Sequence, residues 1–551
     1  MGRPQREPWD KESEALPPPE ENPSPPVDPP QGGDPSLSTV ALEGSDLVSP
    51  VEVALPPGGE ESQGPGGGGE TGKGDLKGKV LAGSIWSLGG YGASQVIRLG
   101  SSLILTRVLF REVFGVMALV QTFVTGIHMF SDLGIGPSLI QNPDGEKPEF
   151  YNTAWTLQVF RGMGIWLLSF LIAWPAARFY YNPGWTTYTQ WDLFLFIPAV
   201  GFSALISGFN STAIFTLNRR LDLKKLTLLQ LGYQGVAVVI MVSWAIEWKT
   251  VWALIGGRLI ADVFFAVVSH RIIPGYRNRF HWDRKYALEL VHFGKWIFLS
   301  TVLTFLAQQS DKLIFGKIVT LETLGVYWVA FNLAVLPTTG ILKIGSQVAF
   351  PAYSEKVRSG ESLQETFWRM RKPLVAMGGV ILGVYLVSGR DVVAFLYDPR
   401  YSGAGWMLQL LALGAWFQIQ ECTNGSALLA LGDARWVAAG NAAKVAGLIV
   451  LVPLGYTLFG FKGAILGLAG ADLFRYLVSM AGLAKHGVRV VLGDLRLDLL
   501  LGLSVGLGFL AKAILRLPTP SFLAGFLGGL AALLPWAIYG LVLLRKERAR
   551  R

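Results

Sequence analysis

The stretch LIFGKIVTLETLGV, Leu313–Val326, aligns without a gap on LILTRVLFREVFGV, Leu103–Val116, at an offset of 210 positions. The same offset superposes GRLIADVFFAVVSH, Gly257–His270, on GLAGADLFRYLVSM, Gly467–Met480. Self-similarity at one fixed offset over such a distance indicates a duplicated structural unit. The sequence therefore predicts two halves that share one architecture.

The residues around these repeats are apolar over lengths that suit a lipid bilayer. The chain is 51% hydrophobic and 16% charged, and from about residue 80 onward apolar runs of membrane-spanning length follow one another. Their periodicity and breaker residues predict about fourteen helices, centred near residues 94, 124, 164, 204, 237, 261, 303, 335, 382, 417, 447, 474, 506 and 533. We expect an all-α integral membrane protein with two six-helix pseudo-symmetric lobes, related by an axis along the membrane normal, and two extra C-terminal helices.

Four segments follow from this pattern. Residues 1–75 form an acidic, Pro- and Gly-rich tail with a net charge of roughly −11, a composition typical of disorder. The N-lobe is predicted over 76–286, the C-lobe over 287–486, and the last two helices with a basic C-terminus over 487–551. The tail could equally be a solvated extension without a role in transport, or reflect a misassigned start.

The distribution of Lys and Arg predicts the orientation. The loops on one side carry about 27 basic groups against roughly 11 on the other, which places both termini in the cytoplasm. The loops on the opposite side are short, so no folded external domain is expected. The first residues lack the pattern of a signal peptide. The single cysteine, Cys422, excludes an intramolecular disulfide.

Two helices carry polar stripes at equivalent positions of the repeat. At the offset of 210, the stripe Tyr91, Ser94, Arg98 and Ser101 falls on Thr301, Thr304, Gln308 and Asp311. A charged side chain near the middle of a membrane helix costs about 2.5 to 3.5 kcal/mol, so these stripes should face protein or water. We interpret them as opposing walls of one hydrated cavity; the alternative is that they only bind helices together. Lys312, one position off its stripe, is expected to snorkel toward the membrane surface.

Other intramembrane charges divide into two groups. Arg258 and Asp262 are four residues apart, and Asp472 and Arg475 three apart, so each set could form an intrahelical pair. Alternatively Asp262, Asp472 or Glu421 titrates and couples transport to a proton or sodium gradient. The interior as a whole favours cations, and Arg binds phosphate oxygens through paired hydrogen bonds. The candidate cations are Arg98, Arg161, Arg258, Lys343, Lys444 and Arg475.

Several catalytic and binding motifs are absent or accidental. The stretch GGGETGKG, Gly67–Gly74, imitates a phosphate-binding loop but has Gly where Ser or Thr is required and no flanking strand. The histidines and the cysteine show no metal-ligand spacing, and no catalytic Ser/His/Asp set is recognisable. We therefore expect a protein that is no enzyme and has no metal, cofactor or nucleic-acid partner.

Three phrases resemble a known family. They are FSDLGIGPSLIQ (Phe130–Gln141), QQSDKLIFGKIVTLETLGVYWVAFNLAVLP (Gln308–Pro337) and VAFPAYSE (Val348–Glu355). They are similar to the Wzx-type oligosaccharide flippases, most closely the colanic-acid exporter branch. These polysaccharide transporters belong to the multidrug/oligosaccharidyl-lipid/polysaccharide flippase superfamily. The resemblance runs from about Leu76 to Lys485.

The resemblance implies a function. Two lobes would alternate between inward and outward openings and move polyprenyl-pyrophosphate-linked oligosaccharide repeat units across the inner membrane for cell-surface or exopolysaccharide synthesis. A polysaccharide polymerase and chain-length machinery would be partners. Cavity cations of the family are thought to hold the pyrophosphate, which points here to Arg98. Asp311 matches a recurring Asp of the seventh helix, and Asp132 lies in the phrase SDLG.

Two alternatives share this fold. A cation-coupled multidrug antiporter would rely on acidic cavity groups, for which Asp262, Asp472 and Glu421 are the candidates. A flippase for lipid-linked peptidoglycan precursors would also suit a cationic interior.

Overall fold

The computed structural model describes residues 71–131, 134–220, 222–515 and 520–550, and among them the side chains outside 71–85, 88, 291–300 and 546–550. All of these residues belong to one unit, Ser36–Arg551. They contain helices and no strand, which confirms the all-α prediction. The predicted tail lies outside the described residues except for 71–75, which belong to the first helix.

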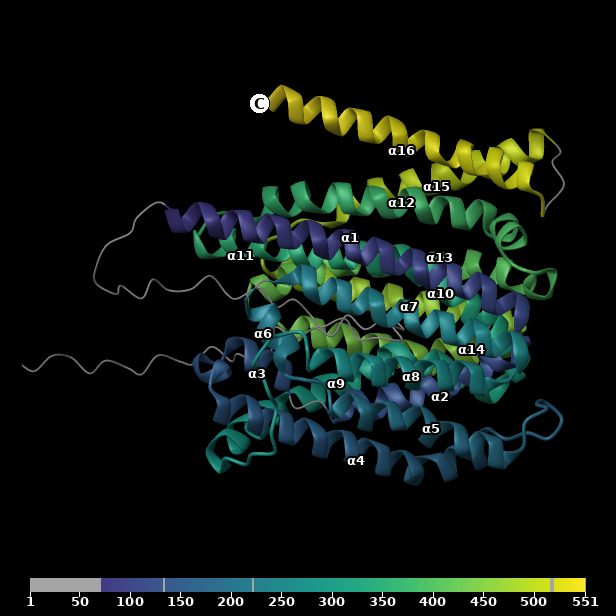
Figure 1. Cartoon of the computed structure of the whole chain (residues 1–551). Coiled ribbons are helices and arrows are strands. Elements are labelled where there is room, and N and C mark those ends of the chain that lie inside the picture. Colours follow the sequence, from purple (N-terminus) through teal and green to yellow (C-terminus); the bar gives the residue numbers. More distant parts are fainter. Residues whose placement is uncertain (1–70, 132–133, 221, 516–519, 551) are drawn as a thin grey trace, which may run out of the picture. The chain divides into compact units, whose positions relative to one another are not determined.

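The first half of the repeat supplies six long helices and two short ones (Figure 1). They are α1 (Thr71–Val108), α2 (Arg111–Phe130), α3 (Ile135–Gln141), α4 (Pro148–Tyr180), α5 (Gln190–Gly208), α6 (Ala213–Arg219), α7 (Leu223–Glu247) and α8 (Val251–Ser269). A short 3-10 turn, Pro143–Glu146, precedes α4. Within this half α1 packs on α7, α4 on α5, and α7 on α8.

The second half continues with helices that are partly bent or merged. They are α9 (Arg284–Ile318), α10 (Leu321–Ile344), α11 (Phe350–Arg358), α12 (Leu363–Leu396), α13 (Gly403–Ala430), α14 (Arg435–Lys485), α15 (Val491–Ile514) and α16 (Phe522–Arg550). A π-helical segment, Gly345–Ala349, joins α10 to α11, and a 3-10 turn, Pro399–Tyr401, precedes α13. Across the two halves α2 packs on α10 and on α9.

In the described part of the chain, ten helices are long and apolar enough to cross a membrane. Each predicted helix centre falls inside a helix, with 447 and 474 on either side of a bend in α14. Gly460 makes this bend with φ 60° and ψ −149°, a conformation that is open to glycine and strained for other residues. The predicted number of fourteen crossings stays a prediction.

The last two helices pack against one helix of the second half. Helices α15 and α16 contact each other and α12. The indole of Trp536 lies against Gly379, where a Cβ atom would collide with the ring. The buried Lys512 Nζ lies 2.5 Å from Asp391 Oδ2, which joins α15 to α12 by an ion pair. The helices outside the repeat are thereby fixed to the C-lobe.

The segment between the two halves is bound to the first half. The Arg279 backbone N–H donates to Asn152 Oδ1 at 2.9 Å, and the Asp283 N–H donates to Thr153 Oγ1 at 3.1 Å. Asp283 then caps α9, accepting from the N–H of Lys285 at 2.8 Å. The start of α9 is therefore held by α4 of the N-lobe.

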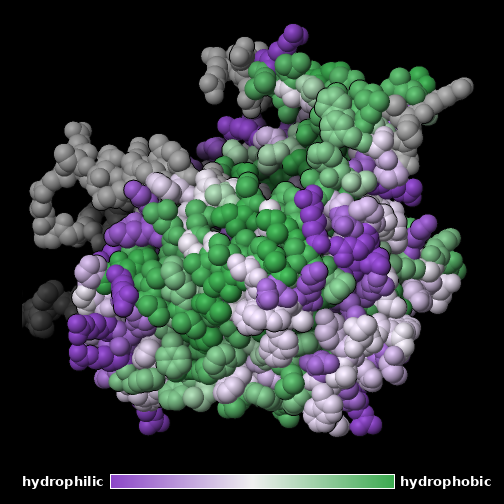
Figure 2. Space-filling view, turned by 45° about the vertical axis from the view of Figure 1, so that its right-hand side comes forward, coloured by the Kyte–Doolittle hydropathy of each residue, from purple (hydrophilic) through white to green (hydrophobic). Residues whose placement is uncertain are grey.

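The exterior has the distribution expected in a bilayer. On the face drawn in Figure 2, hydrophobic residues cover a broad contiguous field and hydrophilic residues gather to its left and right. Large apolar side chains such as Leu171, Leu492 and Ile514 are exposed. Apolar surface of this extent, open to the outside, is typical of a protein in contact with lipid.

Candidate functional site

A cavity of about 210 Å³ lies among α1, α2, α7 and α10. We call it the central cavity. Its wall contains four residues of the predicted stripe of α1, namely Tyr91, Ser94, Arg98 and Ser101. From the second half, α10 supplies Lys343, Asn332 and Trp328. The cavity is therefore built by both halves of the repeat, which is where a transporter of duplicated architecture is expected to bind its substrate.

The cationic residues of the cavity contact two successive turns of α1. Arg98 Nη2 donates to Gln95 Oε1 at 2.5 Å, one turn toward the start of the helix. Lys343 Nζ lies 4.8 Å from the ring centroid of Tyr91, a cation–π contact. The Tyr91 hydroxyl donates to Thr339 Oγ1 at 2.7 Å and so ties α1 to α10. Both cations thus meet the wall near residues 91–95.

The opposing wall differs from the prediction. Thr304, Gln308 and Asp311 do not line the central cavity. Asp311 is 6% exposed and accepts a hydrogen bond from the Tyr327 hydroxyl at 2.5 Å. Helix α10, which packs on α2, supplies the residues of the second half on this wall, and no described residue of α9 contributes to it. The predicted pair of stripes therefore lies in two different environments.

Lys312 was wrongly expected to snorkel. Its side chain is buried, with Nζ 3.2 Å from Asp311 Oδ1 and 3.9 Å from the ring centroid of Phe331. The adjacent carboxylate and the aromatic face retain the ammonium inside the protein. The neighbouring charges Asp311 and Lys312 thus form a buried ion pair within the C-lobe.

Arg161 also lies away from the cavity wall. It donates from Nη2 to the His128 carbonyl at 2.8 Å and from Nε to Ser131 Oγ at 3.2 Å. A cation at the last carbonyls of α2 interacts favourably with the helix dipole. The structure gives Arg161 a role in ending α2. Asp132, in the next position of the family phrase, lies outside the described residues.

Asp262 lies directly behind the cavity wall. The Tyr233 hydroxyl, itself on the wall, donates to Asp262 Oδ1 at 2.9 Å, while Oδ2 is buried without a hydrogen-bond partner. The Arg258 guanidinium donates to Gln121 Oε1 at 2.5 Å. Among the described residues, Arg258 and Asp262 form no ion pair with each other. The expected intrahelical pair is absent because Gln121 of α2 takes the guanidinium.

Asp472 is neutralised by the part of α14 that precedes the bend, and Glu421 of α13 is neutralised by α14. Lys444 Nζ lies 2.6 Å from Asp472 Oδ1, and Arg475 Nη2 lies 3.0 Å from Glu421 Oε2. Gln418 Nε2 donates to the second oxygen of Asp472 at 2.9 Å. The predicted pairing of Asp472 with Arg475 is wrong, because each partner bonds across to a neighbouring segment.

A further buried ion pair was not predicted. Arg371 is fully buried and donates to both carboxylate oxygens of Asp494, at 2.8 and 2.6 Å. Its Nη1 donates to the Gln420 carbonyl at 2.7 Å. The two charged residues lie far apart in the sequence, so no local spacing signals them. This pair joins α12, α13 and α15.

The far end of the central cavity adjoins a close contact of α2 with α10. We call this contact the α2–α10 crossing and define it by Arg111, Gly115, Glu322 and Gly325. Gly115 and Gly325 are equivalent in the repeat, and a Cβ atom on either would collide with a carbonyl oxygen of the other helix. Arg111 pairs with Glu322 across the contact. The two halves are therefore joined backbone to backbone at this end.

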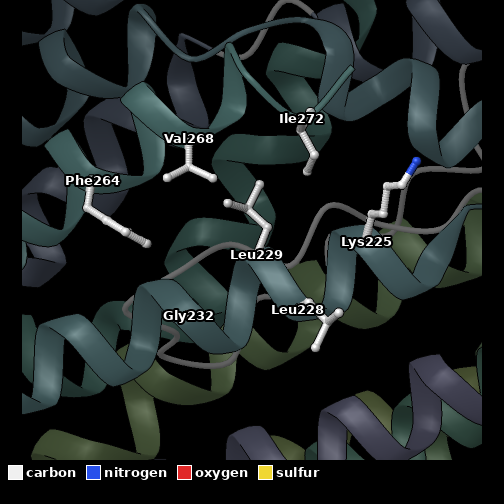
Figure 3. Close-up of a pocket in the computed structure, with 7 residues that line it drawn as sticks. All are labelled: Lys225, Leu228, Leu229, Gly232, Phe264, Val268 and Ile272. Atoms are coloured by element: carbon white, nitrogen blue, oxygen red, sulfur yellow. The ribbon is translucent and has the colours of Figure 1, made fainter. Parts of the chain in front are cut away.

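A second cavity, of about 290 Å³, lies between α7 and α8 (Figure 3). Leu228, Leu229, Phe264 and Val268 line it, and Lys225 points away from them in the view of Figure 3. Lys225 forms an ion pair with Asp222 at 3.0 Å. The lining offers carbon surface and little else, so this cavity suits an acyl chain and lacks the groups that recognise a polar substrate.

Some cavity residues were missed by the sequence analysis. Gln230 and Gln234 of α7, and Trp328 and Asn332 of α10, lie on the wall. Both pairs have a spacing of four, which places each on one helix face. A search for polar faces in every predicted helix would have found them.

Comparisons with known proteins agree with this architecture. The sequence profile of the family described as "Polysaccharide biosynthesis protein" matches residues 104–403, which is more than half of the chain. The teichuronic acid biosynthesis protein TuaB of Bacillus subtilis (strain 168) is 22% identical over 315 residues, covering 55% of this chain and 61% of that protein. The lipopolysaccharide biosynthesis protein WzxC of Escherichia coli (strain K12) is 21% identical over 417 residues, covering 73% and 80%.

Two solved structures have the same fold. The lipid II flippase MurJ, in an inward closed conformation, aligns with a TM-score of 0.66 at 12% identity, covering 85% of this chain and 99% of MurJ. An inward-facing multidrug resistance transporter of the MATE family aligns with a TM-score of 0.58 at 10% identity, covering 76% and 97%. At these identities the likeness concerns the fold alone. Together with the family profile, it establishes that this chain is a multi-pass membrane protein of the polysaccharide biosynthesis protein family.

Proposed function

We propose that this protein is a flippase that moves polyprenyl-pyrophosphate-linked oligosaccharide repeat units across the inner membrane by alternating access. The observation that carries the proposal is the pair of cations in the central cavity. Arg98 from the first half and Lys343 from the second half both meet the wall near Tyr91 and Gln95. A pyrophosphate held between them would be bound by both lobes at once.

The cavity suits an anionic substrate better than a cationic drug. Among the described residues, the ionisable groups of its wall are two cations and three tyrosines: Arg98, Lys343, Tyr91, Tyr233 and Tyr397. The carboxylates that an antiporter for cations would use are elsewhere: Asp472 and Glu421 are paired with Lys444 and Arg475. Asp262 lies behind Tyr233. Transport of lipid-linked glycan therefore fits the charges better than drug extrusion.

The orientation and the driving force belong to the same proposal. With both termini in the cytoplasm, the Lys343 end of the cavity would face the cytoplasmic leaflet and the α2–α10 crossing would close the other side. Asp262, which has one carboxylate oxygen without a partner, is the carboxyl that we propose for coupling to a proton or sodium gradient. A polymerase and chain-length machinery would take up the product.

The function is tested by deleting the gene and analysing surface polysaccharide together with lipid-linked intermediates. We expect one polymer to be lost and its lipid-linked repeat unit to accumulate on the cytoplasmic leaflet. Intact polysaccharide with increased sensitivity to cationic compounds would favour the antiporter. Accumulation of lipid-linked peptidoglycan precursor would favour the precursor flippase.

The cation site is tested by complementing this deletion with Arg98→Ala. We expect polymer export to fall to the level of the deletion strain while the amount of protein in the membrane is unchanged, because the guanidinium lies on the wall of the central cavity. Arg178→Ala is the matched control, since Arg178 is an exposed arginine beside Trp174 on α4. Normal export by Arg98→Ala would contradict the role of this cavity.

A further inference from the structure

We propose that the glycan of the substrate occupies the end of the central cavity beside the α2–α10 crossing, with Trp328 as its stacking platform. The inference rests on the proposed function and adds to it the position and the recognition of the sugars. Trp328 would then be a specificity-determining residue.

The length of the cavity separates two binding regions. Lys343 and Trp328 both line it and lie fifteen positions apart on α10. At 1.5 Å per residue they are about 22 Å apart along the helix. A pyrophosphate held by the cations near Tyr91 is far shorter than this distance. A substrate that fills the cavity must therefore present a different chemical group to Trp328.

The chemistry at Trp328 suits a sugar ring. Its indole is stacked on Phe114 with 5.6 Å between the ring centroids and 24° between the planes, and both rings line the cavity. Asn332 Nδ2 donates to the Trp328 carbonyl at 2.9 Å, which fixes an amide one turn away on the same wall. A pyranose has an apolar C–H face and a rim of hydroxyls. Large aromatic surface with a few placed polar groups is the usual lining for such a ligand.

Gln234 provides an independent indication. Its Nε2 donates to Ser94 Oγ at 2.7 Å, whereas its Oε1 is buried without a hydrogen-bond partner. A buried amide oxygen without a donor is destabilising by about 1 to 3 kcal/mol. Pyrophosphate oxygens at neutral pH are acceptors and cannot satisfy it, but a sugar hydroxyl can. This acceptor lies beside Ser94, at the level of the cations, where it suits a hydroxyl of the sugar that is attached to the pyrophosphate.

The platform also depends on the α2–α10 crossing. Phe114 belongs to α2 and Trp328 to α10, so the stacked pair is contributed by both lobes. Phe114 is the neighbour of Gly115, where the two backbones touch. Separation of the lobes at the crossing would part the two rings. Opening of this side would thereby weaken the hold on the glycan as it is released.

The experiment measures binding of two lipids to the purified full-length protein. One is undecaprenyl pyrophosphate without sugar, and the other is the glycan-bearing lipid that accumulates in the deletion strain. The variants are Trp328→Ala, the conservative Trp328→Phe, and Trp191→Ala as a control at an exposed tryptophan on α5. Their dissociation constants for both lipids are compared with those of the wild type.

We expect the wild type and Trp191→Ala to bind the glycan-bearing lipid more tightly than undecaprenyl pyrophosphate. Trp328→Ala should reduce this preference about tenfold and Trp328→Phe only slightly, with unchanged affinity for undecaprenyl pyrophosphate. That unchanged affinity also reports that the variant is folded. If Trp328→Ala keeps the full preference, or if the wild type shows no preference, the proposed position of the glycan is wrong. Binding of the pyrophosphate would not be affected by either result. Failure of the wild type to bind either lipid would overturn the proposed function, and this inference with it.

Discussion

The N-lobe and the C-lobe contain equivalent carboxylates in opposite surroundings. Asp262 and Asp472 superpose at the offset of 210, yet Asp262 keeps one oxygen without a partner behind the cavity wall. Asp472 is paired with Lys444. The equivalent of Lys444 in the first half is Gln234, which bonds to Ser94 on the cavity wall instead. The first half has an amide, Gln234, where the second half has an ammonium, Lys444. Asp262 therefore lies beside the cavity without a lysine partner, whereas Asp472 lies in a buried ion pair.

The two halves therefore share a fold but use their polar residues differently. The polar groups of α1 line a space that a substrate can enter. The polar groups of α9, α13 and α14 neutralise one another in the pairs Asp311 with Lys312, Glu421 with Arg475, and Asp472 with Lys444. Breaking a buried pair by removing one partner is strongly destabilising, because the other charge stays buried. Variants in the two lobes should therefore fail in different ways.

The largest effect on stability is expected for Lys312→Met. It leaves Asp311 as a buried carboxylate without its cation, which should destabilise the protein by about 3 to 5 kcal/mol. The midpoint of unfolding of the purified protein in a denaturant titration measures the loss. The double variant Asp311→Asn with Lys312→Met removes both charges and should recover most of it. A single variant as stable as the wild type would show that the pair of Asp311 with Lys312 is not needed for stability.

An intermediate effect is expected for Gly115→Ala. The added methyl group collides with the Leu321 carbonyl, and overpacking of this kind costs about 1 to 3 kcal/mol, so the α2–α10 crossing should open. Closure is measured by thiol cross-linking between R111C and E322C in a background with Cys422→Ser, which removes the single native cysteine.

Gly92→Ala is the control for this measurement, since a Cβ at Gly92 meets nothing within 4 Å. We expect Gly92→Ala to cross-link like the parent and Gly115→Ala to cross-link much less. Equal yields in all three would mean that the crossing tolerates a side chain and is no tight closure.

The smallest effect on stability is expected for Asp262→Asn. The Tyr233 hydroxyl can still donate to the amide oxygen, so the change should be about 1 kcal/mol or less. Transport should nevertheless lose its dependence on the ion gradient, which is measured by glycan export with the gradient imposed or collapsed. Asp472→Asn is the matched comparison: it should lower stability by leaving Lys444 unpaired and leave the gradient dependence intact. The reverse result would move the coupling site to the C-lobe.

Much of the architecture could be predicted because it depends on local and repeated patterns. Apolar periodicity identified the helices, and the bend at Gly460 divides α14 between two predicted helix centres. The stripe of α1 was found by its three- and four-residue spacing, and its members share the wall of the central cavity. These features follow from the geometry of a single helix, and the spacing of residues in the sequence is enough to predict them.

Partnerships between helices could not be predicted in the same way. Spacing alone suggested Arg258 with Asp262 and Asp472 with Arg475, whereas the structure joins Arg258 to Gln121 and Arg475 to Glu421. Residues three or four apart on a helix can interact, but so can any side chain that packing brings to the same face. In the interior, a cross-helix partner that completes the hydrogen bonds of a charge is favoured over a strained local one.

The class of protein, the duplicated helical plan and the helix face of α1 that carries Arg98 could be inferred from hydrophobicity, periodicity and the offset of 210. Helix packing was needed to show that α10, and not α9, faces α1 across the cavity, and that Lys312 lies inside the C-lobe. The physical reason is that hydrophobicity and periodicity act within one segment, whereas burial of a charge is stable only when packing supplies its partner. The packing of the helices therefore decides which carboxylates are buried in ion pairs and which lie beside the central cavity.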